Sequence, residues 1–169
     1  MEEALLEICA NTYTATDIHR RLSLLQECVE EVVYHAHAKG ILKEEALAFA
    51  KTIMSPLDVQ AFSEWGDSVW GLFSPHAVAE VIQALKTQSE MLPMLILYVP
   101  VLFEPEKVAS LGQWAREQIA PHILLEMHID PAVTGGCAFV FNDTYHDYSL
   151  HRAFAAHKGV VRELLNTYA

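Results

Sequence analysis

The hydrophobic residues of positions 1–90 are spaced as in helices. Between Asp17 and Lys39 they recur in steps of three and four and so form one apolar stripe, made of Ile18, Leu22, Leu25, Val29, Val32 and Ala36. Thr14 or Thr16 can cap the start of this helix, and Gly40 is a typical residue just past a helix end. The pattern predicts a long amphipathic helix over residues 17–39.

Two later helix starts are marked by a cap motif. Ser55 is followed by a proline and then by Asp58, which combines an N-cap, a proline in the first helical position and an acidic first turn. Ser74-Pro75 repeats the cap and the proline. We predict that the first of these helices is interrupted near Gly66 and that the second ends near Ser89.

Shorter helices are predicted at Glu2–Cys9 and Leu42–Ile53. Three aromatic residues of this region have helical spacing, which favours a place in the core over an exposed binding surface: Trp65, Trp70 and Phe73. Residues 1–91 are therefore predicted to form an all-α N-terminal bundle of five or six helices, with connections short enough for antiparallel packing.

Beyond Pro93 the spacing changes to that of strands. Met94–Val101 is a continuous apolar run rich in β-forming residues, which is typical of a buried strand. Pro105–Ile119 returns to helical spacing, and Trp114 is expected to pack this helix against a sheet. His122–Asp130 alternates, which predicts a strand with one buried and one wet face. The buried side would hold Ile123, Leu125, Met127 and Ile129, and the wet side His122, Leu124, Glu126 and His128.

The rest of the chain predicts a hairpin and a closing helix. Cys137–Phe141 is a third strand, and Asn142-Asp143 can make a tight turn into the short strand Thr144–Asp147. Ser149 is expected to cap a last helix whose apolar residues are Phe154, Val161, Leu164 and Leu165. Residues 92–169 are thus predicted to form a small α+β domain of order β-α-β-β-(β)-α.

The net charge of the chain limits the classes of partner that it is expected to bind. The net charge of -11, from 22 acidic and 11 basic residues, argues against a nucleic-acid binder and against docking on an anionic membrane surface. A protein partner with basic or apolar surface patches would complement this acidic chain. The acidic N-terminus lacks the basic region of a secretory signal, and no apolar run approaches the roughly 18 residues of a membrane span. Cys9, Cys28 and Cys137 are widely spaced, which fits reduced side chains in a cytoplasmic protein.

The nine histidines suggest a metal site, but their spacing does not support one. His35 and His37 lie two residues apart on a helix and would point in different directions. His122, Glu126 and His128 share a predicted strand face, where a zinc site would still need further convergent ligands and supporting hydrogen bonds. A wet polar face is the favoured interpretation of these three residues, and their role is left open.

The sequence also lacks a catalytic signature. Ser149 has His146, Asp147 and His151 close by, but neighbours in sequence point apart at a strand-to-helix junction. No nucleophile elbow, P-loop, dinucleotide fingerprint or H-E-x-x-H is present. We therefore predict a non-catalytic protein without a metal or cofactor, and an enzyme with an unfamiliar site is the least favoured alternative.

One segment, residues 129–152, carries an ordered set of marker residues: Ile129, Asp130, Pro131, Gly135, Gly136, Asp143, Asp147 and Ser149. With this order and spacing it resembles the C-terminal signature of the F-type ATP synthase delta subunit, which is named the oligomycin sensitivity-conferring protein in mitochondria. The order of elements from the strand at 94 onward fits that family, and the N-terminal bundle is similar only in class. The chain departs from the family in having Tyr148 where a glycine is usual between the later Asp and Ser.

The resemblance implies a structural component of the synthase's peripheral stalk, located in the cytoplasm and attached to the membrane through the complex. The helical domain would hold the N-terminal helices of the alpha subunits, and the α+β domain would hold the C-terminal helices of the b subunits, both by helix-in-groove contacts. The marker residues are implied to be structural, and the sequence does not indicate which residues contact partners. The alternative is an adaptor or regulator outside the synthase that has kept the α+β domain as a binding module.

Overall fold

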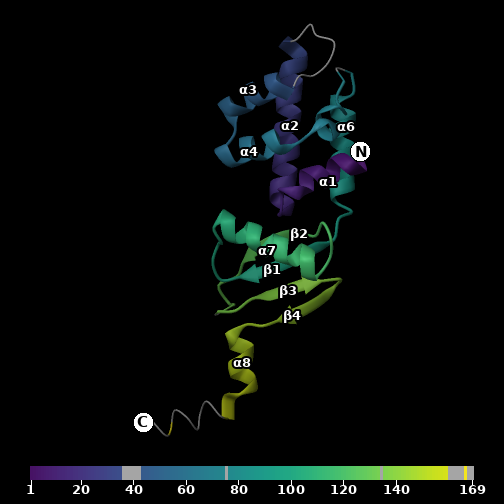
Figure 1. Cartoon of the computed structure of the whole chain (residues 1–169). Helices are drawn as coiled ribbons and strands as arrows, with labels where there is room; N and C mark the ends of the chain where they lie inside the picture. The colour runs from purple at the N-terminus through teal and green to yellow at the C-terminus, as the bar shows by residue number, and fades with distance from the viewer. Residues whose placement is uncertain (36–42, 75, 134, 160–165, 167–169) are drawn as a thin grey trace.

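A computed structural model of the chain describes residues 1–35, 43–74, 76–133, 135–159 and 166. Figure 1 shows a helical part stacked on an α+β part, with the last described helix projecting from the far side of the sheet. A helical region followed by a small sheet with helices is the order that the sequence predicts, and the fold class is confirmed at this level.

The described residues of the helical part contain six helices, in agreement with the five or six predicted. They are α1 (Glu2–Ala10), α2 (Ala15–His35), α3 (Lys43–Ile53), α4 (Pro56–Glu64), α5 (Asp67–Trp70) and α6 (Val78–Ser89). Their apolar faces meet in one core, in which Phe62 and Trp65 are fully buried and stack with ring centroids 4.2 Å apart. Trp70 and Phe73 are buried in the same core, which confirms their predicted place.

Side-chain caps mark the starts of α2 and α4 in the helical part. Thr14 caps α2, because its hydroxyl accepts the backbone N–H of Asp17 at 3.0 Å. Ser55 caps α4 in the same way through the N–H of Asp58, and Gly66 stands in the break between α4 and α5. The prediction that Ser74-Pro75 opens a helix was wrong: α6 begins at Val78, after a turn in which the N–H of Ala77 bonds to the Ser74 carbonyl.

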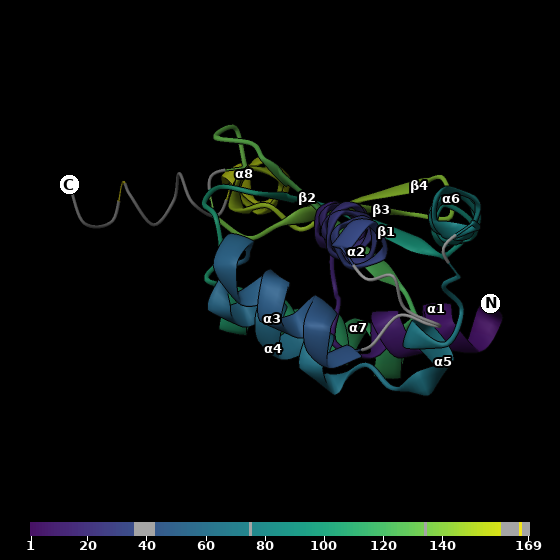
Figure 2. The ribbon, with the colours of Figure 1, turned by 90° about the horizontal axis from the view of Figure 1, so that it is seen from above.

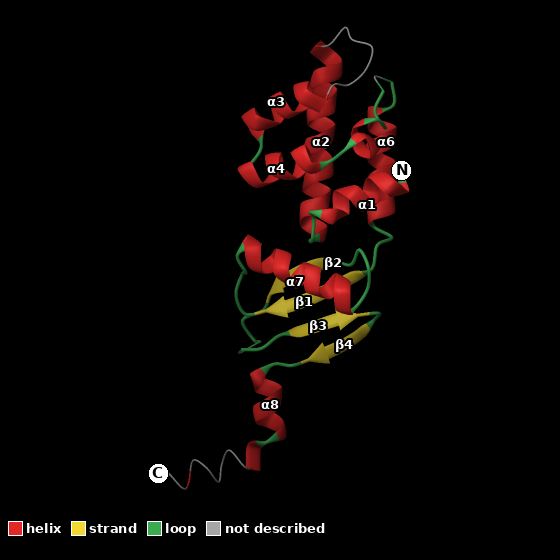
Figure 3. Cartoon of the chain, in the orientation of Figure 1, coloured by secondary structure: helices red, strands yellow, loops and turns green. Residues whose placement is uncertain are grey.

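The α+β part is a four-stranded sheet with one helix packed on it (Figure 3). Its elements are β1 (Met94–Val99), α7 (Pro105–Gln118), β2 (Leu124–Ile129), β3 (Ala138–Phe141), β4 (Thr144–Asp147) and α8 (Leu150–Ala156). The strand order is β2-β1-β3-β4, in which β1 and β2 run parallel and the other neighbours are antiparallel. Both residues of the β3–β4 turn have positive φ, 47° for Asn142 and 58° for Asp143, as the predicted tight hairpin requires.

A second core lies between α7 and one face of the sheet. Leu95, Leu97 and Leu125 point into it and are buried. Leu124, predicted on the wet side of its strand, is instead buried in the core of the helical part, because the start of α2 lies against that face of β2. Trp114 is 52% exposed, so the prediction that it packs α7 on the sheet was wrong.

Three strands are shorter than predicted, and β3 lacks only the first predicted residue, Cys137. β1 ends at Val99, and Val101 is exposed in the loop that follows. β2 begins at Leu124, because His122 has φ 60° and lies in the turn before the strand. Within the described residues, no helix is both long enough and apolar enough to cross a membrane. Several positions of the sequence prediction lie outside the described residues: Ala36, Gly40, Val161, Leu164 and Leu165.

Candidate functional site

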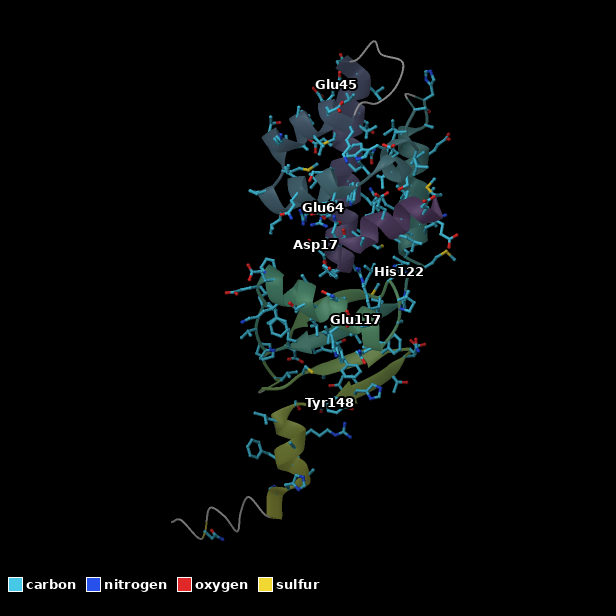
Figure 4. The ribbon with its side chains drawn as sticks, in the orientation of Figure 1. Asp17, Glu45, Glu64, Glu117, His122 and Tyr148 are labelled. Carbon is cyan, nitrogen blue, oxygen red and sulfur yellow. The ribbon has the colours of Figure 1, made fainter. Side chains whose placement is uncertain are left out.

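The polar residues that suggested a metal site do not converge. Glu126 and His128 lie on one face of β2, with the His128 Nε2 atom 2.8 Å from the Glu126 Oε1 atom. His122 lies before the strand, at its other end, near the junction of the two parts (Figure 4). Within the described ranges, no three His, Cys, Asp or Glu side chains are arranged to hold a metal ion. His37 lies outside these ranges.

Ser149 serves as a helix cap. Its hydroxyl accepts the backbone N–H of Arg152 at 3.3 Å, and its own N–H donates to the Asp147 Oδ1 atom at 2.8 Å. Hydrogen bonds from the Ser149 side chain and from the Ser149 N–H hold the pKa of the Asp147 carboxyl below its usual value. The ring of His146 stacks on Phe139 at 4.9 Å instead of approaching the serine. The arrangement therefore starts α8 and does not activate a nucleophile.

A shallow groove lies between α3 and α4, with a volume of about 530 Å³. It is lined mainly by apolar atoms, from Lys51, Met54, Pro56, Val59, Gln60 and Ser63. Lys51 is the one ionisable side chain in this lining, so the groove lacks the paired acid and base that proton transfer would need.

The Asp58 carboxylate is a buried polar group with several hydrogen-bond partners, and its residue is only 1% exposed. It accepts hydrogen bonds from Arg20, from the Nε atom of Arg21 at 3.1 Å and from the Ser55 hydroxyl at 2.7 Å. Arg21 also donates to the Thr12 hydroxyl at 2.7 Å. This cluster ties α2, α4 and the α1–α2 connection together within the helical part.

Sequence reasoning assigned Asp58 a place in the first turn of α4 but missed its two arginine partners. The available signal was Arg21 itself, which directly precedes Leu22 of the apolar stripe of α2. A charged side chain at the edge of a buried apolar stripe needs an oppositely charged group to pair with. The spacing does not say which of the many acidic residues supplies it.

The Asp58 cluster predicts a pH dependence of stability. Burial alone would raise the pKa of the Asp58 carboxyl, but hydrogen bonds from Arg20, Ser55 and Arg21 together hold it below its usual value. The unfolded chain therefore takes up this proton first as the pH falls below about 4, and the contribution of Asp58 is lost as the pH passes through the lower folded pKa. Between pH 6 and 3, the free energy of unfolding of the wild type should fall more steeply than that of Asp58→Asn in parallel urea titrations. Parallel slopes would contradict the assignment.

Four marker residues of segment 129–152 lie at the start of α8: Gly135, Gly136, Asp147 and Ser149. Gly135 and Gly136 both have φ 78°, and the Gly135 carbonyl accepts the N–H of Leu150 at 3.0 Å. A Cβ atom on Gly136 would lie 2.3 Å from the backbone oxygen of Tyr148, so only glycine allows this approach. Asp143 lies apart from them, in the β3–β4 turn at the far end of the hairpin.

The beginning of the segment turns the chain out of β2. The Asp130 side chain accepts the N–H of Ala132 at 2.9 Å, and the Asp130 N–H continues the sheet by donating to the Val99 carbonyl. Pro131 lies in the same turn. The prediction that Ile129 is on the buried side of its strand was wrong, because this residue is 53% exposed at the strand's end. The glycines that follow bring the chain back to the sheet, where the N–H of Tyr148 bonds to the Cys137 carbonyl. We call this connected set the α8 junction: residues 129–133, 135–137 and 147–150.

The helix that the α8 junction directs outward has no cover within the described residues. All its residues are exposed, and it projects from the side of the sheet away from the helical part (Figure 1). Its apolar side chains include Leu150 at 50% and Phe154 at 57% exposure, next to the exposed Tyr148. No acidic residue stands between Tyr148 and Arg162, so α8 is a basic, partly apolar helix on an otherwise acidic chain.

Comparison with known proteins does not assign a family. No protein-family model matches the chain, and no curated protein matches its sequence. The function is therefore argued from the geometry and from the marker residues of the α8 junction.

Proposed function

We propose that this chain is a non-catalytic peripheral-stalk component of an F-type ATP synthase. In this role it links the alpha and beta subunits of the catalytic head to the stalk formed by the b subunits and resists the torque of the rotor. It would work in the cytoplasm, attached to the membrane through the complex. Its partners would be the N-terminal helices of the alpha subunits on the helical part and the C-terminal helices of the b subunits on the α+β part.

The uncovered α8 helix carries this proposal. A helix of seven residues gains little stability from its own hydrogen bonds and normally depends on packing against other elements. Here none of its residues is buried, while Ser149, Gly135 and Gly136 fix its start firmly on the sheet. A helix held outward with exposed Leu150 and Phe154 is suited to bind another helix.

Two further features support the proposal. The order of a helical part followed by a small sheet agrees with the order that the resemblance implies. The marker residues of the α8 junction serve backbone geometry, with glycines at positive φ, an Asp130 turn and a Ser149 cap. A protein of the stalk needs such a shaped binding element and no polarised pocket.

Phe154→Asp is expected to weaken binding to the C-terminal segment of the b subunit from the same organism by about 100-fold or more, as for a central apolar anchor. The reason is that the Phe154 ring is 57% exposed and free to enter a partner's groove, where a carboxylate would be desolvated. Binding is measured by isothermal titration calorimetry with the full chain. The melting temperature should stay unchanged, because α8 buries no residue.

Met91→Asp is the matched control, since Met91 is 82% exposed in the turn after α6, away from α8. It should bind the b segment as the wild type does. A second titration with the N-terminal peptide of the alpha subunit should be unaffected by Phe154→Asp. If the wild type binds neither peptide, the stalk proposal fails and the chain is better explained as an adaptor or regulator outside the synthase.

A further inference from the structure

Arg116 joins the two parts of the molecule. It lies in α7, yet its guanidinium donates to the Cys9 carbonyl at 2.7 Å and to the Thr12 carbonyl at 2.6 Å, both in the helical part. A longer contact of 3.4 Å runs from its Nε atom to the Ile123 carbonyl, just before β2. The carbonyls at the end of a helix lack partners within the helix, and a cation there is favoured by the helix dipole. Arg116 thus caps the C-terminus of α1 from another part of the fold.

Tyr13 completes the contact around this arginine. The Cζ atom of Arg116 lies 4.5 Å from the centroid of the Tyr13 ring, which places the cation over the ring face. One turn earlier in α7, a Cβ atom on Gly112 would lie 2.6–2.8 Å from atoms of the same tyrosine side chain. The glycine therefore lets α7 come close enough for Arg116 to reach the end of α1. Seen from above, α7 lies beneath the helices of the helical part, next to α1 (Figure 2).

The backbone between α1 and α2 also adds to the sheet. The N–H of Leu125 donates to the Tyr13 carbonyl at 2.8 Å, and Thr14 forms a parallel bridge with Leu125. On the same strand, Leu124 inserts its side chain into the core of the helical part and is 1% exposed. Charge-assisted hydrogen bonds, a ring contact, a sheet bridge and an apolar side chain therefore cross one boundary. We call this set the inter-part joint: Cys9, Ala10, Thr12, Tyr13, Thr14, Gly112, Arg116, Leu124 and Leu125.

Arg116, which is half-buried in α7, differs in its partners from Arg21, which is buried in the helical part. Arg21 pairs with the Asp58 carboxylate and also donates to the Asn11 carbonyl, whereas Arg116 bonds to backbone carbonyls without a carboxylate partner among the described residues. Burial lowers the pKa of Arg116, but the group stays charged because the usual value for arginine lies far above neutral pH. Carbonyls cannot move independently of the backbone, so a guanidinium that holds them fixes the position of the whole α1–α2 connection.

From this geometry we infer that Arg116 locks the helical part and the α+β part into one rigid body. Parts joined by a small interface normally move relative to each other, so rigidity here requires specific contacts. The connection between α6 and β1 is short, but a single chain connection alone would leave rotation about it free. The inference goes beyond the proposed function and does not depend on it, because the lock is a property of the isolated chain.

The test measures distances between the two parts in the full chain. Spin labels are attached at Glu45→Cys in α3 and Ser110→Cys in α7, both exposed, in a chain that also carries Cys137→Ser. Cys9 and Cys28 are buried and are left in place. Pulsed electron spin resonance should give one narrow distance distribution. Arg116→Met should broaden it about twofold or more, as expected for parts free to move, while circular dichroism keeps its helical signal.

Lys107→Met is the matched control, because Lys107 is an exposed cation on the same helix. It should leave the distribution narrow. Arg116→Lys should give an intermediate width, since a single ammonium cannot reproduce the forked donors of a guanidinium. A broad wild-type distribution, or a narrow one in a folded Arg116→Met chain, would overturn the inference. If Arg116→Met fails to fold, Arg116→Lys decides: a width equal to that of the wild type rejects the lock.

Discussion

Replacing Asp58 with alanine is expected to lower the free energy of unfolding by about 3–5 kcal/mol, the cost of leaving a buried charge without its partner. Arg21 is 8% exposed and loses its carboxylate, and the Ser55 hydroxyl loses its acceptor at the cap of α4. The loss can be measured by urea unfolding followed through the fluorescence of the buried Trp65 and Trp70. A loss of that magnitude is a large fraction of the roughly 5–15 kcal/mol by which folded domains are stable.

Asp17→Asn serves as the control, because Asp17 also pairs with Arg20, but at the surface, at 2.7 Å. An exposed pair three residues apart on a helix contributes only about 0.2–1 kcal/mol. Comparing the two variants contrasts a buried carboxylate with an exposed one, since both Asp58 and Asp17 bind Arg20. Equal effects of the two substitutions would mean that the Asp58 cluster is no more important to stability than a surface pair.

The parts of the fold that could be predicted from sequence are those determined by neighbouring residues. The cap and first-turn proline at Ser55, the Thr14 cap and the Asn142-Asp143 turn involve atoms within a few residues of each other, so their chemistry is readable from sequence. The start of α6 was misplaced although Ser74-Pro75 has the same two features as the start of α4. Capping residues permit a helix start but do not require one.

Burial that depends on distant elements could not be predicted in the same way. Leu124 stands on the polar side of an alternating strand, and only the position of the helical part above β2 makes that side apolar at this one residue. Trp114 has the spacing of a core residue, yet α7 turns it outward to 52% exposure. Periodicity describes the faces of an element but does not say what each face meets.

The inter-part joint shows the same limit at a candidate functional feature. The acceptors of Arg116 in the helical part are backbone carbonyls more than 100 residues earlier in the chain, and a carbonyl has no signature in the sequence. The α8 junction was more accessible, because its glycines, turn aspartate and cap serine lie within one segment. The sequence therefore indicates the segment that starts α8, but not the contacts that Arg116 makes between the two parts of the molecule.

Gly136→Ala is expected to disrupt the α8 junction, and the loss of stability should exceed the roughly 1–2 kcal/mol of the left-handed backbone alone. At φ 78° the new methyl group would lie 2.3 Å from the Tyr148 carbonyl oxygen and 3.2 Å from the Ser149 Cα atom. Both neighbours are backbone atoms at the start of α8, so the strain is relieved only if the helix moves. The hydrogen bond from the Tyr148 N–H to the Cys137 carbonyl would then break.

Hydrogen exchange measured by NMR reports the local stability of the α8 junction for each backbone amide. In Gly136→Ala, the amides of Tyr148 and Leu150 should exchange about tenfold faster or more, the change that corresponds to roughly 1.4 kcal/mol of local stability. Amides in the core of the helical part should be unaffected, and binding of the segment from the b subunit should weaken because α8 is no longer held in place.

Gly135→Ala is the matched control for Gly136→Ala. Its φ is also 78°, so the conformational cost is the same, but the atom nearest to its new methyl group is the end of the Leu150 side chain, which can rotate away. The difference between the two variants therefore measures the backbone contact at Gly136 by itself. Equal exchange rates in the two variants would show that this contact does not position α8, and the proposed binding helix would then lack the fixed start on which the stalk function depends.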